Sequence, residues 1–141
     1  MKMKKKHKLC VVGAGRWGLN HIRTLHELGH LGGVIDVNDI SLNEIKLKYP
    51  ECSVFSNLDS SFSSNFDGYI VSTPPSTHFK IAKKIINNSK HVLVEKPLTL
   101  NLKDAISLNE LAKSKNVNLM VGHLLLFHPA FKKIKKLIDD G

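Results

Sequence analysis

The sequence has few cysteines, few aromatic residues and no long apolar run, and each scarcity excludes a class of protein. The two cysteines in 141 residues, Cys10 and Cys52, are too few for a disulfide framework and lack the spacing of metal ligands. We therefore expect a reduced, cytoplasmic compartment and no bound metal. No apolar run approaches the ~20 residues that span a bilayer, so no membrane segment is expected. The basic start, residues 1–7, is followed by too short an apolar stretch for a signal peptide.

Acidic residues are also scarce, since 12 of them stand against 21 lysines and arginines and leave a formal net charge of +9. Such an excess occurs in nucleic-acid-binding proteins. Here the basic residues are divided between the start of the chain and lysine pairs on predicted helices, where solvated helix faces explain them as well as phosphate contacts would. Aromatic residues make up 6% of the chain and are not interleaved with the basic ones. We expect no nucleic-acid partner.

The most informative segment is a glycine-rich turn that joins an apolar strand, residues 9–12, to a predicted helix. Gly13 permits a tight turn, Gly15 lets the backbone approach a pyrophosphate, and Gly18 lets the helix pack closely on the strand. The pyrophosphate then lies at the helix N-terminus, where free N–H groups favour an anion. A turn without a ligand is the alternative. The predicted cofactor-binding residues of this turn are Gly13, Ala14, Gly15, Arg16, Trp17 and Gly18.

A second apolar strand ends in Asp36, 18 residues after Gly18, which is close to the spacing of a ribose-binding acid. Its carboxylate is expected to accept hydrogen bonds from the adenosine ribose. The same charge would repel a 2′-phosphate, and no neighbouring arginine offsets it, so NAD is favoured over NADP. The alternative is that Asp36 or Asp39 only caps the following helix.

Apolar strands alternate with amphipathic helices along the whole chain, which predicts an α/β fold with a doubly wound parallel sheet of the Rossmann type. Right-handed crossovers give the strand order 3-2-1-4-5-6, with a ligand across the carboxyl ends of the strands. Residues 57–65 are predicted to form a surface connection or a short helical turn. The expected strands are 9–12, 31–36, 53–55, 67–72, 91–95 and 117–121, and the expected helices include 41–48, 77–88 and 102–115, the last begun by Asn101.

The fourth predicted strand runs into a segment rich in hydroxyl groups and proline. Ser72 and Thr73 are expected to offer hydroxyls to the ribose or the nicotinamide, in a loop stiffened by Pro74 and Pro75. Ser76 or Thr77 is expected to cap the next helix, and capping alone is the alternative function of this segment. The predicted cofactor-binding residues here are Ser72, Thr73, Pro74 and His78.

The fifth predicted strand ends in Glu95 and Lys96, at the same edge of the sheet, and both are predicted cofactor-binding residues. Lys96 is the candidate catalytic residue, because its ammonium could assist deprotonation of a substrate hydroxyl as a hydride leaves. A solvated Glu–Lys pair is the alternative. After the sixth strand, His123 and, less strongly, His128 are candidates for ligand contact. The alternative is that each only forms hydrogen bonds within the protein, as histidines at strand ends usually do.

Taken together, the motifs GAGRWG (13–18), STPPSTH (72–78), EKP (95–97) and GHLLLFHPA (122–130) resemble those of the Gfo/Idh/MocA oxidoreductases. The resemblance implies a Rossmann domain that binds NAD(P), in enzymes that oxidise or reduce hydroxyls of sugars and cyclitols and assemble as dimers or tetramers. It places Lys96 at the reacting hydroxyl and the nicotinamide, and it makes Glu95 the glutamate of the motif. The last motif is most similar to members acting on nucleotide-activated sugars in surface polysaccharide pathways.

Family members continue into a second α/β domain that binds the substrate, which is absent from these 141 residues. We therefore expect a basic tail (1–7), a dinucleotide-binding domain (8–125) and a truncated connecting helix (126–141). On one interpretation the chain is the cofactor half of a sugar or nucleotide-sugar dehydrogenase, unable to turn over unless the missing domain is supplied. On the other it is a non-catalytic dinucleotide-binding module or a truncated gene remnant.

Overall fold

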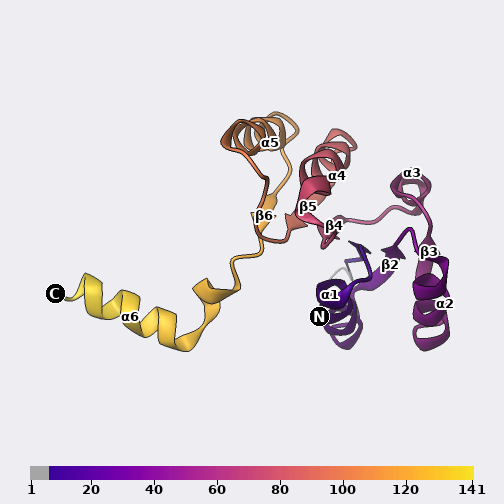
Figure 1. Cartoon of the computed structure of the whole chain (residues 1–141), viewed down its shortest axis with the longest axis horizontal. Helices are drawn as coiled ribbons and strands as arrows, with labels where there is room; N and C mark the ends of the chain where they lie inside the picture. The colour runs from indigo at the N-terminus through magenta and orange to yellow at the C-terminus, as the bar shows by residue number, and fades with distance from the viewer. Residues whose placement is uncertain (1–6) are drawn as a thin grey trace, which may run out of the picture.

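The computed structural model describes residues 7–141, so the predicted basic tail lies outside the described residues except for His7. Strands and helices alternate through most of the chain (Figure 1). The elements are β1 (Leu9–Val12), α1 (Arg16–Glu27), β2 (Leu31–Ile35), α2 (Asp39–Lys48), β3 (Ser53–Phe55), α3 (Leu58–Ser61), the 3-10 turn η1 (Phe62–Ser64), β4 (Gly68–Val71), α4 (Pro75–Asn87), β5 (His91–Val94), α5 (Leu102–Ser114), β6 (Leu119–Val121), the 3-10 turn η2 (Leu124–Phe127) and α6 (Pro129–Asp139).

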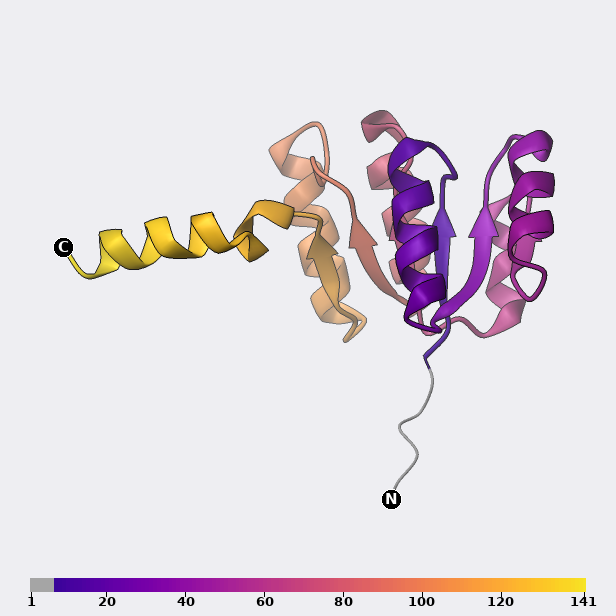
Figure 2. The same ribbon diagram turned by 90° about the horizontal axis from the view of Figure 1, so that it is seen from below.

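The six strands form one parallel sheet in the order β3-β2-β1-β4-β5-β6, which confirms the predicted doubly wound topology. Val12 at the end of β1 pairs with Ile35 and Val71, and Val94 pairs with Val71 and Val121. The carboxyl ends are therefore level, and Figure 2 shows the arrowheads pointing to the same edge. Any group that follows a strand is delivered to this edge.

Side chains alternate between the two faces of the sheet, as expected for strands covered by helices on both sides. Cys10 and Val12 pack toward α4 and α5, whereas Val11 between them packs toward α1 and α2. Figure 1 shows these two helix pairs on opposite faces of the sheet. The helices contribute Ala82, Ile85, Ile86, Leu108 and Ala112 to the first core, and Ile22, Leu25, Leu42 and Ile45 to the second.

Two predictions about helix starts need correction. The cap of α2 is Asn38, whose side chain accepts from the N–H groups of Ile40 and Ser41, so neither Asp36 nor Asp39 caps this helix. The predicted start of the helix after β4 was late, because α4 begins at Pro75 with Pro74 as its N-cap. Proline is favoured at the first helical position. Ser76 and Thr77 consequently lie inside the first turn and do not cap it.

The glycine pair in β2 makes room for an aromatic ring. A Cβ atom on Gly33 would lie 2.6 Å from the Phe66 ring, and one on Gly32 would lie 2.9 Å from it. Phe66 is only 2% exposed and packs edge-on against Phe55 and Tyr69. The small residues in this strand are therefore part of the core packing.

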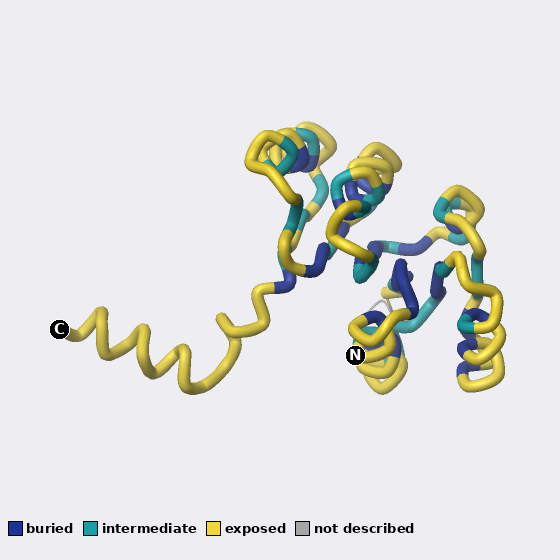
Figure 3. Tube along the Cα trace, viewed as in Figure 1, coloured by how far each residue is buried: buried dark blue, intermediate teal, exposed yellow. Residues whose placement is uncertain are grey.

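The final segment, η2 and α6, leaves the body of the domain at the end of β6 (Figures 2 and 3). Its apolar side chains are between 46% and 74% exposed. They are Leu124, Leu125, Leu126, Phe127, Phe131, Ile134, Leu137 and Ile138. Among residues 7–141, no helix has the length and apolar character needed to cross a membrane.

We predict that Gly33→Ala lowers the free energy of unfolding by about 1–3 kcal/mol, because the new methyl group must displace the Phe66 ring in a filled core. Urea unfolding of the 141-residue chain measures this change. The double variant with Phe66→Leu, which removes the ring, should recover part of the loss. Equal stability of Gly33→Ala and the unmodified chain would show that the ring moves away freely.

Candidate functional site

Three adjoining hollows run along the carboxyl edge of the sheet. The first, about 520 Å³, lies between β1, β2 and α3; the second, about 200 Å³, lies beside the start of α1; and the third, about 430 Å³, lies beside η2. The first and second share Ser72 and Thr73. The second and third share Trp17, Glu95 and Lys96. The three hollows therefore adjoin in a row along this edge of the sheet, and we call this row the channel.

The glycine turn between β1 and α1 borders the first hollow. Gly13 has φ +95°, and a Cβ atom on it would lie 2.9 Å from the carbonyl oxygen of Ser72. A Cβ atom on Gly18 would lie 1.8 Å from the carbonyl oxygen of Gly13. A Cβ atom on Gly15 would meet nothing within 4 Å. The fold requires Gly13 and Gly18, whereas the space above Gly15 is open.

No side chain caps the start of α1, the helix that follows this turn. Gly15 is the N-cap residue, no side chain accepts from the first turn, and no acidic residue lies there. Arg16 and Trp17 are exposed beside this end of the helix. Free N–H groups and the helix dipole make such an end suitable for an anion.

Asp36 lies at the end of β2, as predicted, and its carboxylate is already oriented. Oδ2 accepts from the N–H of Ala14 at 2.6 Å, and Oδ1 accepts from the N–H of Asn38 at 2.9 Å. A carboxylate oxygen can accept more than one hydrogen bond, so both oxygens retain acceptor capacity, and Asp36 lines the first hollow. The carboxylate is thereby held between the glycine turn and the start of α2.

The hydroxyl protons of Ser72 and Thr73 are donated to groups within the chain, so these hydroxyls could meet a ligand only as acceptors. Ser72 Oγ lies 3.1 Å from the carbonyl oxygen of Val12 and 3.0 Å from that of Gly13, both of which only accept. Thr77 Oγ1 donates to the carbonyl oxygen of Pro74, so Thr73 Oγ1 donates to Thr77 Oγ1 at 2.7 Å. These hydroxyls shape the channel and retain only acceptor capacity toward it.

The structure does not support the prediction that His78 contacts the cofactor. It is only 1% exposed, its Nδ1 lies 2.8 Å from the carbonyl oxygen of Pro97, and its Nε2 lies 2.8 Å from that of Thr73. Neither ring nitrogen is available to a cofactor. Because both partners only accept, the ring donates to both at once only when each nitrogen carries a proton. His78 thus joins the loop after β4 to the loop after β5.

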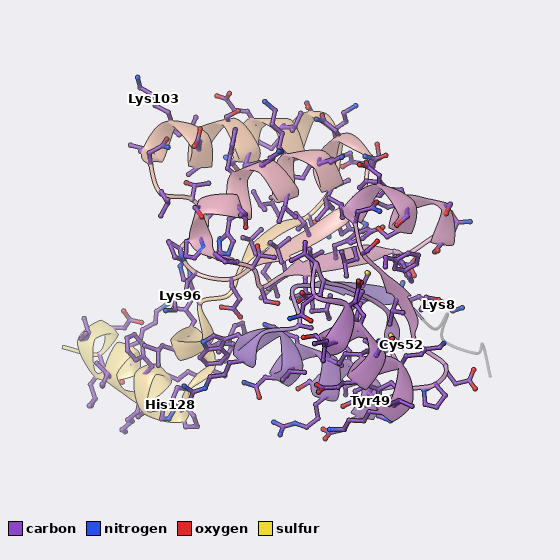
Figure 4. All side chains as sticks on the ribbon, turned by 45° about the vertical axis from the view of Figure 1, so that its right-hand side comes forward. Lys8, Tyr49, Cys52, Lys96, Lys103 and His128 are labelled. Atoms are coloured by element: carbon purple, nitrogen blue, oxygen red, sulfur yellow. The ribbon has the colours of Figure 1, made fainter. Side chains whose placement is uncertain are left out.

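Lys96 is exposed at the end of β5, and its side chain lines both the second and the third hollow. The Lys96–Pro97 peptide bond is cis. Figure 4 places Lys96 on the side of the molecule from which the chain leaves toward α6, well separated from Lys8. Among the described residues its ammonium has no carboxylate partner, so the alternative, a solvated pair of Glu95 and Lys96, does not form.

The partner of Glu95 is His21, a residue that sequence reasoning missed. Nε2 of His21 lies 2.7 Å from Oε1 of Glu95, and the Glu95 side chain is 10% exposed. Oε2 of Glu95 accepts from the N–H of Lys96 at 3.3 Å. The only available signal was the position of His21 in the first helix after the glycine turn, because 74 residues separate it from Glu95.

The third hollow is mostly apolar. Trp17, which is 51% exposed, lines it together with Glu95, Lys96, Gly122, His123, Phe131 and the η2 residues Leu124, Leu125 and Leu126. His128 is not part of this lining; it caps α6 through Nδ1, which accepts from the N–H of Ala130.

The far end of the first hollow also contains residues that sequence reasoning did not assign. Leu58 from α3 and Ile81 from α4 line it, together with Asp59 and Lys84, which form an ion pair with each other. The prediction for residues 57–65 was a surface connection or a short helical turn, and the structure has the short helices α3 and η1 there. Leu58 lines the first hollow only because the fold places α3 near Ile81 of α4.

The two cysteines take no part in this edge. Both are free and buried, and burial raises the pKa of the Cys52 thiol to about 11 and that of Cys10 further. Protonated, buried thiols are poor nucleophiles.

The topology, the glycine turn and the acid at the end of β2 define a Rossmann-type dinucleotide-binding domain. The model of the Gfo/Idh/MocA oxidoreductase family, described as having an NAD-binding Rossmann fold, matches residues 7–123. The chain belongs to this family.

Similar proteins of named function support the assignment. UDP-N-acetylglucosamine 3-dehydrogenase of Acidithiobacillus ferrooxidans is 30% identical over 126 residues, covering 89% of this chain and 40% of that protein. The WlbA dehydrogenase of Bordetella pertussis, solved with NADH and UDP-GlcNAcA, has a TM-score of 0.91 at 25% identity, covering 97% of this chain and 43% of that one. GenD2 from gentamicin A biosynthesis, solved with NAD, has a TM-score of 0.89 at 28% identity, covering 97% and 40%. The chain thus spans well under half the length of these relatives.

Gly18 and Gly15 should respond differently to a methyl group. Gly18→Ala should lower the free energy of unfolding by about 2 kcal/mol, because the methyl group collides with the backbone. Gly15→Ala should leave stability unchanged but weaken NADH binding by about tenfold, since the methyl group displaces an anion from the N–H groups of α1. Urea unfolding and NADH titration measure the two effects. Unchanged NADH affinity in Gly15→Ala would place the anion elsewhere.

Proposed function

We propose that this chain is the NAD-binding part of an oxidoreductase that transfers a hydride between a nicotinamide cofactor and a hydroxyl of a sugar or nucleotide-sugar. The observation that carries the proposal is the row of adjoining hollows at the carboxyl edge, of which the first is lined by Gly15 and the second and third by Lys96. Family membership and the dehydrogenase relatives support it.

The residues present fit a dinucleotide. The uncapped start of α1 would hold the pyrophosphate, Asp36 would accept from the adenosine ribose, and Leu58 and Ile81 offer apolar walls near the adenosine end. A carboxylate at Asp36 disfavours a 2′-phosphate, which favours NAD over NADP. When bound, the nicotinamide ring supplies the hydride acceptor for oxidation of an alcohol.

Lys96 is the proposed catalytic residue. Its ammonium would donate a hydrogen bond to the substrate oxygen and stabilise the negative charge there, while a base supplied by polypeptide outside these 141 residues would take the hydroxyl proton. The position suits this role, because Lys96 lies where the second hollow opens into the third. Trp17 and His123 would border the nicotinamide and substrate side.

We also propose a division of the chain into a dinucleotide-binding domain, residues 8–125, and a connecting helix, residues 126–141. The exposed apolar side chains of η2 and α6 support the second part of this division. Substrate recognition, turnover and assembly into a homo-oligomer would then depend on polypeptide outside these 141 residues. The relatives that act on or bind UDP-sugars favour a nucleotide-sugar substrate.

Titration with NADH and NADPH tests the proposed cofactor. Trp17 is the only tryptophan of the chain, and it borders the second hollow, so its fluorescence should be quenched on binding. We predict that NADH binds at least about tenfold more tightly than NADPH, because the Asp36 carboxylate repels the 2′-phosphate. Absence of saturable quenching by either nucleotide, from folded protein, would contradict the proposal.

The variant Asp36→Ser should narrow the NADH preference to about threefold or less by removing that repulsion. Asp39→Ser is the matched control, since it removes the same charge three residues later, outside the lining of the channel. The ratio of the two Kd values, measured by the same quenching, is the readout. An unchanged ratio in Asp36→Ser would assign the preference to other residues.

A further inference from the structure

Lys96 is held through its two sequence neighbours, each by a histidine from a different helix. On one side, His21 in α1 binds the carboxylate of Glu95 at 2.7 Å. On the other, His78 in α4 binds the carbonyl oxygen of Pro97 at 2.8 Å. The two helices belong to opposite layers of the domain (Figure 1).

We propose that His21 and His78 are positioning residues that hold the turn of Glu95, Lys96 and Pro97 from both ends and thereby fix where Lys96 stands along the channel. The consequence for hydride transfer rests on the proposed function. The positioning itself concerns only contacts within the chain.

The Glu95 side of this arrangement is closed around the carboxylate. Oε1 receives the hydrogen bond from His21, and Oε2 receives one from the N–H of Lys96. A Cβ atom on Gly122 would lie 2.9 Å from Oε2, so β6 packs directly against the carboxylate. A buried carboxylate is costly without a hydrogen-bonding partner, and His21 is the side chain that supplies one. Removing His21 would release Glu95 and with it the N–H of Lys96.

The Pro97 side is held by the His78 ring, which is buried and hydrogen-bonded at both nitrogens. His78 is almost completely buried, and its two nitrogens face carbonyl oxygens in two different loops. One of these carbonyls belongs to Thr73, which lines both the first and the second hollow. The ring therefore fixes the distance between the loop that borders the cofactor channel and the loop that carries Lys96.

The two histidines connect Lys96 to two segments that line the channel, the glycine turn and the loop of Thr73. The helix of His21 begins at the glycine turn, and the helix of His78 begins directly after the Thr73 loop. Among the described residues the Lys96 side chain has no ion-pair partner of its own. Its position is consequently determined by its backbone, which these two contacts hold.

Amide hydrogen exchange of the cofactor-free chain, followed by NMR, tests the positioning directly. In His21→Gln and in His78→Gln, we expect exchange at the Lys96 amide to rise by at least about tenfold, the effect of losing a hydrogen bond that holds the turn. Amides of β1 and β2 should stay within about twofold. The control is His91→Gln, which removes a histidine that also bonds to backbone, at the opposite edge of the sheet.

The outcomes separate positioning from simple stabilisation. Unchanged exchange at Lys96 in both variants overturns the proposal, and so does an equal rise at all core amides, because the histidines would then only stabilise the fold. If His78→Gln does not fold, His21→Gln decides, since the His21 side chain is 20% exposed and its loss should be tolerated. These results do not require cofactor.

A second measurement links the positioning to the cofactor. The lysines are labelled by reductive methylation with ¹³C, and the Lys96 signal is assigned with Lys96→Arg. NADH should shift this signal in the unmodified chain, and the shift should fall by about half or more in each histidine variant, while the Kd from Trp17 quenching stays within about threefold. A full shift in both variants overturns the link to Lys96.

Failure of the unmodified chain to bind NADH contradicts the proposed function. The exchange experiment, which needs no cofactor, then still tests whether His21 and His78 position Lys96.

Discussion

The first helix packs so closely on the turn before it that a methyl group on Gly18 would lie 1.8 Å from the Gly13 carbonyl oxygen. This close approach brings the start of α1 to the end of β1, at the centre of the sheet. The same packing brings Ser72 Oγ against the turn, which ties β4 to β1 at the level where both strands end. The channel along the edge, and the distance from Gly15 to Lys96, depend on this geometry.

The sheet and its strand order could be predicted because they depend on local patterns. Short apolar runs separated by amphipathic segments specify parallel strands, and right-handed crossovers then leave few possible orders. The cap of α5 was equally predictable, because the Asn101 side chain accepts from the N–H of Asp104, three residues later in the same segment. The start of α2 was not, since Asp36, Asn38 and Asp39 all suit a cap and only tertiary contacts decide. Asp36 is occupied by the Ala14 N–H, which leaves the cap to Asn38.

The candidate site was predictable in position but not in hydrogen bonding. The ends of parallel strands must meet at one edge, so Asp36, Ser72 and Lys96 could be assigned to it from the sequence. Which donors remain free depends on partners far away in the chain. Glu95 pairs with a histidine 74 residues earlier, and His78 bonds to the carbonyl oxygen of Pro97, 19 residues later. No spacing rule predicts either contact, because both depend on how helices dock on the sheet.

The helix caps distinguish the ligand-facing part of the edge from the rest. Among the described α-helices, α2, α3, α5 and α6 each begin with a side chain that accepts from the first turn, whereas α1 and α4 do not. These two helices follow β1 and β4, the central strands where the strand order reverses. At α4, Pro75 has no N–H, and the N–H of Thr77 donates to the Pro74 carbonyl oxygen. The start of α1 has no such proline, and an anion bound there would accept from N–H groups that side chains cap in α2, α3, α5 and α6.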